Sequence, residues 1–423
     1  MNDLLVIGSG LAGLTAAWQA SQCGKRVQLI AKGWGATHWH AGCVDVLGYW
    51  PLESDTATSV SLSTGVTNPT SKLVELITEN RQHPYALVGI ETLVKALDGF
   101  KQLCMAAGYP LLGSLEKNWL LPSAVGTFRP TCLAPATMTA GDLTNDAPML
   151  LVGFEQLVDF FPNIAADNLT QQGIPARHVM LDLPTLAQRH MLTSVILARL
   201  MEQPAFRAEV VAAVKPHLGA AQRVGFPAVL GMEQTTAVHQ DLQVQLGRPI
   251  FEIPGLPPSV AGMRLHHILK TAVEKNGGRV FAGMEAVGFE AEGGRVTAVQ
   301  TEAAARNRSH HYQQYVLATG GLLGGGITTN HLGEVKEVVF DLPVQGTDGR
   351  QSWFRQDFMD ARGHPIYRAG IQVDDALRPV DGYGRVLYEN LYAAGTTLAH
   401  CEAIRERSFD GIALATGYAV GQV

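Results

Sequence analysis

The chain has 423 residues, of which 46% are hydrophobic and 17% are charged, and its formal net charge is −6. This length and balance predict an enzyme-like protein of two or three domains with a large buried core. The slight negative charge offers no basic face, which excludes nucleic acid as a partner. The five cysteines form no C-x-x-C pair. We therefore expect buried, reduced thiols, and neither a disulfide framework nor an iron–sulfur cluster held by this chain alone.

The N-terminus predicts a βαβ unit. Apolar residues 4–7 form a strand, residues 14–20 form an Ala-rich helix, and residues 26–30 form a second strand. Between the first strand and the helix stands Gly8-Ser9-Gly10-Leu11-Ala12-Gly13, and a G-x-G-x-x-G turn in this context is typical of dinucleotide binding. The stretch 4–24 has the length of a membrane span, but it contains four glycines and forms this nucleotide-binding unit.

The three glycines of the turn have separate roles. Gly8 permits the tight turn, Gly10 lets the backbone approach a pyrophosphate, and Gly13 lets the helix pack closely on the sheet. The N-terminus of the helix presents free N–H groups to the bound anion. The turn therefore predicts a phosphate-binding site.

The end of the second strand departs from the usual pattern. An adenosine ribose is commonly held there by an acid, but the chain has Ala31-Lys32-Gly33. Ala31 cannot accept a hydrogen bond from a ribose hydroxyl. Either another loop supplies this anchor or the adenosine is absent. A basic residue at this place also suits a 2′-phosphate, which leaves NADP as a minor alternative.

The middle of the chain predicts an inserted region. Residues 50–80 are rich in Ser and Thr and are expected to form an exposed excursion. From 85 to 250, helices such as 90–107 and 194–202 alternate with short apolar strands such as 149–152. Nothing in this stretch repeats the nucleotide motif, so we interpret it as an α+β cap domain.

The chain then returns to its first domain. Ser259 is expected to cap a helix that runs to Asn276, and residues 279–281 form the next strand. A hairpin over 286–304 and a buried strand over 315–317 follow.

The last segment predicts a strand over 390–395 and a helix over 410–419 with Asp410 as its N-cap. Three glycine-rich strand ends then meet at the carboxyl edge of one parallel sheet, where ligands bind in open α/β sheets. These ends are Gly8 to Gly13, Thr319-Gly320-Gly321 and Gly395 with Thr396.

The predicted fold is α/β, a Rossmann-like FAD/NAD(P)-binding domain assembled from both ends of the chain with the cap inserted. The expected domains are 1–85, 255–330 and 385–423 for the flavin, 86–254 for the cap, and 331–384 as a late insertion that could belong to the cap. The predicted flavin-binding residues are Gly8, Ser9, Gly10, Leu11, Ala12, Gly13, Lys32, Gly33, Thr37, Gly42, Asp45, Thr319, Gly320, Gly321, Gly395, Thr396, Asp410, Gly411 and Ile412.

The candidate catalytic residues are two histidines and two arginines. His38 and His40 lie in the loop after the second strand, where a histidine can move a proton or bond a flavin ring, or simply shape the loop. Their spacing lacks the partner pattern of a metal site. Arg129 and Arg264 could hold a phosphate or carboxylate bidentately, and pairing between domains is the alternative.

The layout resembles two-dinucleotide-binding flavoproteins of the fumarate reductase type, and more closely the B subunit family of anaerobic glycerol-3-phosphate dehydrogenase. The matching segments are residues 8–13, 42–47, 83–89, 129–131, 141–143, 152–154, 251–265, 318–326 and 390–395. They span nearly the whole chain, and 251–265 is the distinctive one.

The resemblance implies a flavin subunit, usually with FMN, whereas the dinucleotide motif favours FAD. It further implies a catalytic flavoprotein partner and an iron–sulfur, membrane-anchoring partner, with sn-glycerol 3-phosphate oxidised to dihydroxyacetone phosphate and electrons passed to quinone. Flavoproteins of this class usually have acids where this chain has Ala31 and Thr396. These departures make FMN easier to accept.

The favoured function is a flavin-dependent glycerol-3-phosphate dehydrogenase (quinone) that is active only with its partner subunits. We expect it in the cytoplasm, at the inner face of the cell membrane only through a partner. The alternatives are a stand-alone FAD oxidoreductase acting on a carboxylic acid, and a non-catalytic relay or structural subunit.

Overall fold

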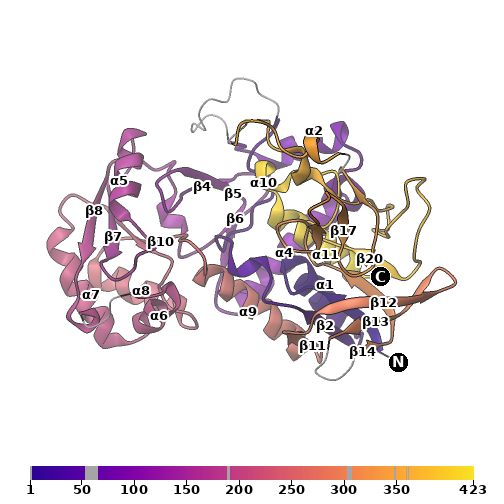
Figure 1. The fold of residues 1–423 in the computed structure, drawn as a ribbon. Coiled ribbons are helices and arrows are strands. Elements are labelled where there is room, and N and C mark those ends of the chain that lie inside the picture. The colour runs from indigo at the N-terminus through magenta and orange to yellow at the C-terminus, as the bar shows by residue number, and fades with distance from the viewer. Residues whose placement is uncertain are drawn as a thin grey trace.

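The computed structural model describes residues 2–52, 65–187, 191–302, 307–346, 349–358, 360 and 362–423. Figure 1 shows two lobes joined by a narrower middle, with both termini in the same lobe. We call this lobe the nucleotide lobe and the other the cap.

The nucleotide lobe is built on a five-stranded parallel sheet whose strands come from both ends of the chain. Its order is β11-β2-β1-β15-β20. The bounds are Arg279–Ala282 for β11, Val27–Ala31 for β2, Asn2–Ile7 for β1, Tyr312–Leu317 for β15 and Leu391–Ala393 for β20. Each neighbouring pair is parallel, so the carboxyl ends of all five strands lie at one edge.

Helices and a second sheet cover the parallel sheet. The helices are α1 (Leu11–Gln22), α4 (Ile90–Ala106), α9 (Val260–Lys275) and α11 (Phe409–Gly421). The antiparallel sheet consists of β12 (Ala286–Glu292), β13 (Arg295–Thr301) and β14 (Arg308–His310). Helix α11 packs closely on α1, because a Cβ at Gly417 would lie 2.4 Å from the Ala12 carbonyl oxygen.

The cap has its own parallel sheet and its own hydrophobic core. The order is β10-β9-β7-β8, with β7 at Met149–Phe154, β8 at Ala176–Leu181, β9 at Arg223–Pro227 and β10 at Ile250–Ile253. Its helices are α5 (Pro162–Gln171), α6 (Ser194–Met201), α7 (Pro204–Val214) and α8 (Thr235–Leu246). The inserted cap is the left-hand lobe of Figure 1.

Shorter elements complete the fold. The antiparallel pairs are β3 (Leu111–Gly113) with β6 (Leu133–Pro135), β4 (Trp119–Pro122) with β5 (Phe128–Thr131), β16 (Ile327–Thr329) with β17 (Val335–Glu337), and β18 (Val344–Gln345) with β19 (Gly370–Ile371). The short helices are α2 (Pro69–Glu79), α3 (Pro84–Val88) and α10 (Ala403–Glu406). Single 3₁₀ turns lie at Ala36–His38, Thr139–Gly141, Pro184–Leu186, Lys215–His217, Arg350–Ser352 and Pro365–Arg368.

The predicted elements of both chain ends are confirmed, including the cap of α9, where the Ser259 hydroxyl accepts from the Gly262 N–H. Three predictions were wrong. The expected excursion over 50–80 contains helix α2, which buries Leu73 and Leu76. Residues 53–64 of that stretch lie outside the described residues. The thiol of Cys23 is exposed, because it follows the last turn of α1 at the surface.

The third error concerns Asp410, which lies in the first turn of α11 rather than at its N-cap. The N-cap is Ser408, without a side-chain hydrogen bond. The Asp410 carboxylate instead accepts the backbone N–H of Asp45, which belongs to a packed neighbouring loop. A tertiary contact has therefore replaced the local one.

The packing suggests an adjustment of the domain limits. Leu93 and Phe100 of α4 belong to the core of the nucleotide lobe, as do Val339 and Ile371 of the late insertion. We propose that α4 and residues 331–384 are parts of the nucleotide lobe, and that the cap is limited to the segment around its parallel sheet.

Candidate functional site

The glycine turn after β1 leaves its backbone open to a ligand. Gly8 has a φ of +116°, and a Cβ there would lie 2.2 Å from the Ala318 carbonyl oxygen. A Cβ on Gly13 would lie 2.0 Å from the Gly8 carbonyl oxygen, so both glycines are required by close packing. A Cβ on Gly10 would meet nothing within 4 Å. No side chain caps α1, and its first N–H groups therefore face this space.

The three predicted glycine ends meet at the carboxyl edge of the sheet. A Cβ on Gly395 would lie 2.8 Å from the Ala12 Cβ, and one on Gly321 would lie 2.5 Å from the Thr396 carbonyl oxygen. The contact of Gly8 with Ala318 joins the turn after β1 to the 319–321 end, which follows β15. The structure thus brings together residues 8–13, 319–321 and 395–396. Leu11 and Ala12 are buried in the first turn of α1 and shape this edge through their backbone.

Two buried hydroxyl groups at this edge lack a partner among the described residues. They are Thr319 Oγ1 and Thr37 Oγ1. Thr319 follows Ala318, and Thr37 lies two residues after Gly35, which contacts Gly10. Buried hydroxyls are normally hydrogen-bonded, so these two indicate a ligand with polar atoms. Together with the uncapped helix N-terminus, they fit the phosphate and ring of a flavin nucleotide.

The loop after β2, where the adenosine of a dinucleotide is expected, is arranged differently. Ala31 is buried, and Lys32 is exposed and forms an ion pair with Glu285 at 2.9 Å. The Ser9 hydroxyl donates to the Gly33 carbonyl oxygen at 2.7 Å, which ties the loop after β2 to the glycine turn. Glu285 follows Met284, whose N–H bonds the Ala31 carbonyl oxygen. A carboxylate from another loop therefore lies at the place where β2 itself provides none.

His38 belongs to a cluster of rings at the surface. Its ring is stacked 5.7 Å from Trp34 and lies edge-on, 4.7 Å from His266. Burial, followed by the neighbouring His40, lowers the pKa of His38. Burial also lowers the pKa of His266 to about 4, and the charge on His38 contributes. Both rings are therefore neutral near pH 7.

His40 is fixed as a donor. Its Nδ1 accepts the Gly42 N–H at 2.8 Å, so in the neutral ring Nε2 carries the proton. This Nε2 is buried and has no partner among the described residues. Gly42 itself has a φ of +76° and contacts Ala261 of α9, which holds the loop in place. His40 thus presents an N–H to a ligand and has no free acceptor.

Asp45 links this loop to the N-terminus of α11. Its N–H donates to Asp410 Oδ2 and its carbonyl oxygen accepts the Gly411 N–H, each at 3.0 Å. Burial, together with the negative charge of Asp45, raises the pKa of Asp410. Ile412 is fully buried beneath these contacts. The α11 end therefore lies beside the His40 loop.

The Asp45 carboxylate lies between two arginines. Arg129 on β5 donates to Asp45 Oδ2 at 2.5 Å, and Arg407 Nε donates to the same oxygen at 3.3 Å. Burial alone would raise the pKa of Asp45, but the two positive charges outweigh it and hold the pKa below its usual value. Sequence reasoning missed Arg407. Its only signal was its position just before a helix N-terminus, where a positive charge is unfavourable without a partner.

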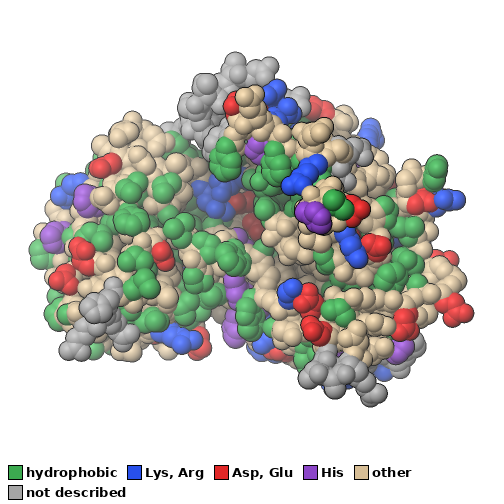
Figure 2. Space-filling model, viewed as in Figure 1, with side chains coloured by type: hydrophobic (Ala, Val, Ile, Leu, Met, Phe, Trp, Pro, Cys, Tyr) green, Lys and Arg blue, Asp and Glu red, His purple; other side chains and the backbone are tan. Residues whose placement is uncertain are grey.

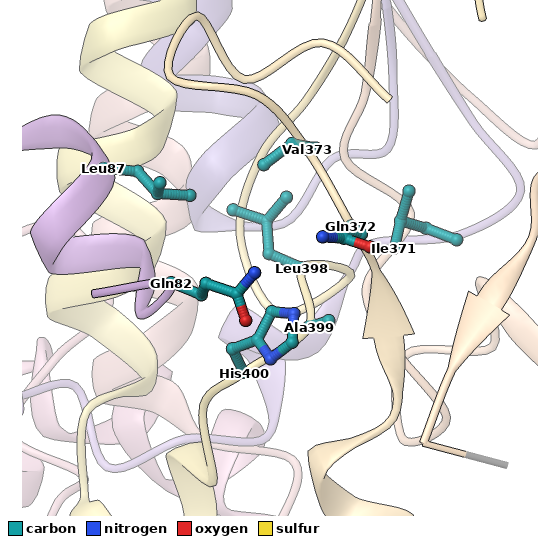
Figure 3. Close-up of a pocket in the computed structure, with 8 residues that line it drawn as sticks. All are labelled: Gln82, Leu87, Ile371, Gln372, Val373, Leu398, Ala399 and His400. Carbon is teal, nitrogen blue, oxygen red and sulfur yellow. The ribbon is translucent and has the colours of Figure 1, made fainter. Parts of the chain in front are cut away.

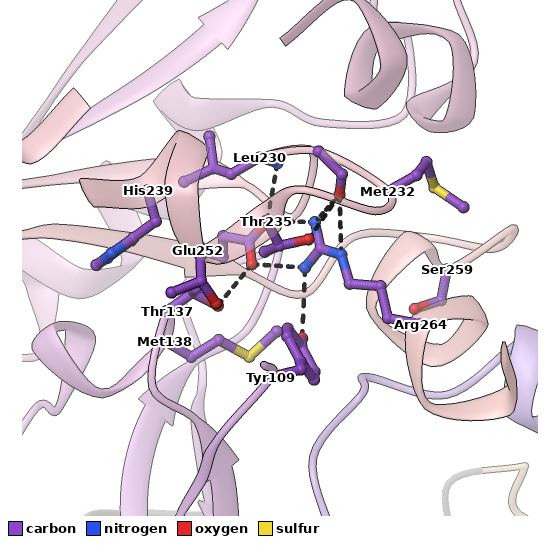
Figure 4. A network of polar contacts seen from close by, with 12 residues as sticks. Tyr109, Thr137, Met138, Leu230, Met232, Thr235, His239, Glu252, Ser259 and Arg264 are labelled. Carbon is purple, nitrogen blue, oxygen red and sulfur yellow. Dashed lines mark hydrogen bonds and ion pairs between the residues drawn. The ribbon is translucent and has the colours of Figure 1, made fainter. Parts of the chain in front are cut away.

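Arg264 lies apart from Asp45, and all of its hydrogen-bond donors are used (Figure 4). Nη1 donates to Glu252 and to the Tyr109 hydroxyl, Nη2 donates to Glu252 and to the Gly231 carbonyl oxygen, and Nε donates to that same oxygen. The Glu252 carboxylate also accepts from the Thr137 hydroxyl and the Leu230 N–H. No donor of Arg264 is left for a substrate. These contacts favour the alternative of pairing between α9 and the cap.

Two small pockets are present among the described residues. One is lined by Gln82, Gln372 and His400 and by apolar side chains, and it includes none of the predicted residues (Figure 3). The other is mostly apolar and reaches Gly321 and Thr396 of the predicted flavin site. Figure 2 shows a hollow between the lobes in which Lys or Arg and His side chains gather.

The chain is similar in sequence to a family of known flavoproteins. The family model described as "FAD binding domain" matches residues 3–408. The chain is 34% identical over 432 residues to the probable B subunit of anaerobic glycerol-3-phosphate dehydrogenase from Halobacterium salinarum, covering 99% of this chain and 97% of the relative. It is 31% identical over 438 residues to the B subunit of anaerobic glycerol-3-phosphate dehydrogenase from Pectobacterium atrosepticum, with coverages of 99% and 97%.

The chain belongs to the B subunit family of anaerobic glycerol-3-phosphate dehydrogenase. Among solved structures it is similar to the open conformation of a flavocytochrome c3 fumarate reductase, with a TM-score of 0.45, 9% identity, and coverage of 99% of this chain and 77% of that one. The family match supports a flavin cofactor, and FAD in particular. Within the described residues, none of the helices combines the length and apolar character needed to cross a bilayer.

Proposed function

We propose that this chain is the flavin-bearing B subunit of an anaerobic glycerol-3-phosphate dehydrogenase. The observation that carries the proposal is the meeting of three glycine ends beside an uncapped helix and two unpartnered hydroxyls, in a chain of this family. The reaction removes a hydride and a proton from sn-glycerol 3-phosphate and gives dihydroxyacetone phosphate. A bound FAD would supply the hydride acceptor.

We assign roles in flavin binding to the chain's own residues from their positions and from their used and unused hydrogen-bonding groups. We assign residues 8–13 to the pyrophosphate, and Thr37, Gly42, Thr319, Gly320, Gly321, Gly395 and Thr396 to the rest of the flavin. Lys32, Gly33 and Glu285 would border the adenosine, with Glu285 as the ribose acceptor that β2 lacks. Asp45, Asp410, Gly411 and Ile412 would form the wall at the N-terminus of α11.

His38 and His40 would have different roles in proton transfer. His40 presents an N–H and has its Nδ1 occupied, so it would donate to a ligand oxygen. His38 is neutral near pH 7 and would be able to accept a proton, because its lowered pKa leaves a lone pair available. Arg129 would face the substrate, whereas Arg264 would hold the cap on α9.

The proposed partners are a catalytic flavoprotein subunit and an iron–sulfur subunit that anchors the complex at the inner face of the membrane and passes electrons to quinone. The clusters must come from partners, because the cysteines of this chain are dispersed. The place of the chain would then be the cytoplasm. The relatives are named as subunits, which supports an assembly of this kind.

A reconstitution experiment tests the proposal. The purified chain and the complex with its partner subunits are each given sn-glycerol 3-phosphate and an artificial dye. We expect dye reduction by the complex and little by the chain alone. Robust oxidation by the isolated chain would refute the dependence on partners.

One observation favours a second candidate, a relay or structural subunit without substrate chemistry. Both acids usual in this class of flavoproteins are replaced, by Ala31 and Thr396. An Arg129→Lys variant in the reconstituted complex separates the two candidates. Unchanged turnover would favour the relay.

A further inference from the structure

The site around Asp45 has more hydrogen-bond donors than its own carboxylate can use. Arg129 gives Nη2 to Asp45 Oδ2, while its buried Nε has no partner among the described residues. The Nε and Nη2 groups form one edge of a guanidinium that can hold two oxygens of an oxyanion. Asp45 therefore occupies the Nη2 group of this edge and leaves the Nε group without a partner among the described residues.

Arg407 is similarly underused. Its Nε donates to Asp45 Oδ2 at 3.3 Å, and no bond to its two Nη groups is found among the described residues. Its side chain is 25% exposed and that of Arg129 is 15% exposed, so the pair is reachable from solvent. One carboxylate oxygen thus serves two cations, while Asp45 Oδ1 accepts nothing from the described residues.

The local charge is suited to an anion. Two guanidinium groups and one ionised carboxylate leave an excess of one positive charge. The raised pKa of Asp410 reduces the negative charge that it adds. A phosphate monoester carries about −1.5 to −2 at neutral pH and offers three acceptor oxygens. Its oxygens can accept from the unused donors, and its charge equals that of the two guanidinium groups once Asp45 is displaced.

The arginine site is also bonded, through Asp45, to the start of α11 and to the loop that holds His40. The Asp45 backbone bonds both Asp410 and Gly411 at the start of α11, and residues 45 and 42 belong to the loop that holds His40. The proposed flavin lies along this same wall. The arginine site is therefore connected through Asp45 to the loop that holds the unpartnered His40 Nε2.

We propose that Arg129 and Arg407 form the binding site for the phosphate group of the substrate, and that Asp45 is the internal counter-ion which the phosphate joins or displaces. This inference rests on the proposed function for the identity of the substrate. The charges and unused donors alone indicate a small oxyanion, and the proposed substrate selects a phosphate monoester among such ligands.

Binding measurements on the purified full-length chain test this site. Dissociation constants are measured by calorimetry for inorganic phosphate and for sn-glycerol 3-phosphate, with wild type, Arg129→Lys and Arg407→Lys. We expect each variant to weaken both ligands by about 10- to 100-fold, since each loses charged hydrogen bonds. Arg385→Lys, at a position paired with Asp381 on the surface, is the matched control and should bind as wild type.

Asp45→Asn gives a second and opposite test. Removing the competing negative charge should tighten phosphate binding by about two- to fivefold, the range of a partly exposed ion pair. A purely structural role for the cluster predicts no tightening. Melting temperatures of all variants show whether the fold is kept.

The outcomes separate the two claims. If Arg129→Lys and Arg407→Lys bind phosphate as wild type while the reconstituted complex oxidises sn-glycerol 3-phosphate, this inference is wrong and the proposed function stands. If the variants lose phosphate binding but the complex does not oxidise sn-glycerol 3-phosphate, the site stands and the proposed substrate is wrong.

Discussion

Two arginine–carboxylate clusters of this protein look alike in sequence and differ in structure. In the first, Arg264 uses all of its donors on Glu252, Tyr109 and Gly231, and its side chain is 2% exposed. In the second, Arg129 and Arg407 share a single oxygen of Asp45 and keep unused donors. The first cluster is closed and the second is open.

A structural ion pair and a binding site differ in how many of their hydrogen-bonding groups are paired. A buried charge is tolerated when every donor and acceptor around it is paired, which is the state of the closed cluster. Unpaired buried groups carry a cost that persists unless a ligand or water satisfies them. The number of unused hydrogen-bond donors, rather than burial or charge, therefore indicates which arginine can bind a substrate.

The largest expected effect is on stability at the closed cluster. Glu252→Gln leaves Arg264 as a buried charge without a counter-ion, so we expect the free energy of unfolding to fall by about 3–5 kcal/mol. Asp45→Asn should cost less, about 1–2 kcal/mol, because its arginines reach solvent. Urea denaturation of the three proteins measures both values. Equal losses would show that the open cluster is structural as well.

The next effect is a pH dependence at the ring cluster of Trp34, His38 and His266. His266 on α9 is buried and neutral, with a pKa lowered from 6.5 to about 4. The folded state gains stability from this at pH values above 6.5 and loses it as the pH falls toward 4, because the unfolded chain binds the proton first. The loss is at most about 3 kcal/mol for this shift.

Thermal or urea unfolding at several pH values measures this dependence. His266→Phe should flatten the curve between pH 6.5 and 4, whereas His331→Gln, at an exposed position outside the ring cluster, should leave it as in wild type. An unchanged curve in His266→Phe would contradict the assignment of the shift to this ring.

The smallest effect on stability is expected at Gly10 of the glycine turn, where the effect on the cofactor should be large. A Cβ on Gly10 meets no atom within 4 Å, so Gly10→Ala should fold normally. It would nevertheless occupy the space through which a pyrophosphate approaches the backbone, and the bound flavin per chain should fall. Absorbance after gel filtration measures it.

Gly255→Ala is the matched control, since its Cβ also meets nothing. Gly13→Ala marks the other extreme, because its Cβ would lie 2.0 Å from the Gly8 carbonyl oxygen and should disrupt packing of α1 on β1. Full flavin content in Gly10→Ala would place the phosphate elsewhere.

Sequence reasoning predicted the parts of the fold that depend on local pattern. The βαβ unit, the hairpin and the three glycine ends follow from periodicity and from turns that require glycine. Long-range packing was not visible in the same way. Helix α4 has an ordinary amphipathic pattern, and nothing in it indicates that Leu93 and Phe100 join the core of the nucleotide lobe rather than the cap.

The candidate site was predicted in its residue types but not in its pairings. Arg129 and Arg264 were equivalent in sequence, and only the count of their hydrogen bonds separates them. Arg407 was missed because its partner Asp45 lies 362 residues away. Asp410 was expected to cap its own helix, which is the commonest local role, but the loop at Asp45 provides a stronger tertiary donor.

The flavin content of the purified chain shows whether the three glycine ends hold FAD. The chain is purified alone, its visible spectrum is recorded, and the released cofactor is identified by mass spectrometry. We expect one FAD per chain, bound at the glycine ends next to the open arginine cluster. A chain that folds and joins its partners but carries no flavin would contradict it, and stoichiometric FMN would contradict the choice of FAD.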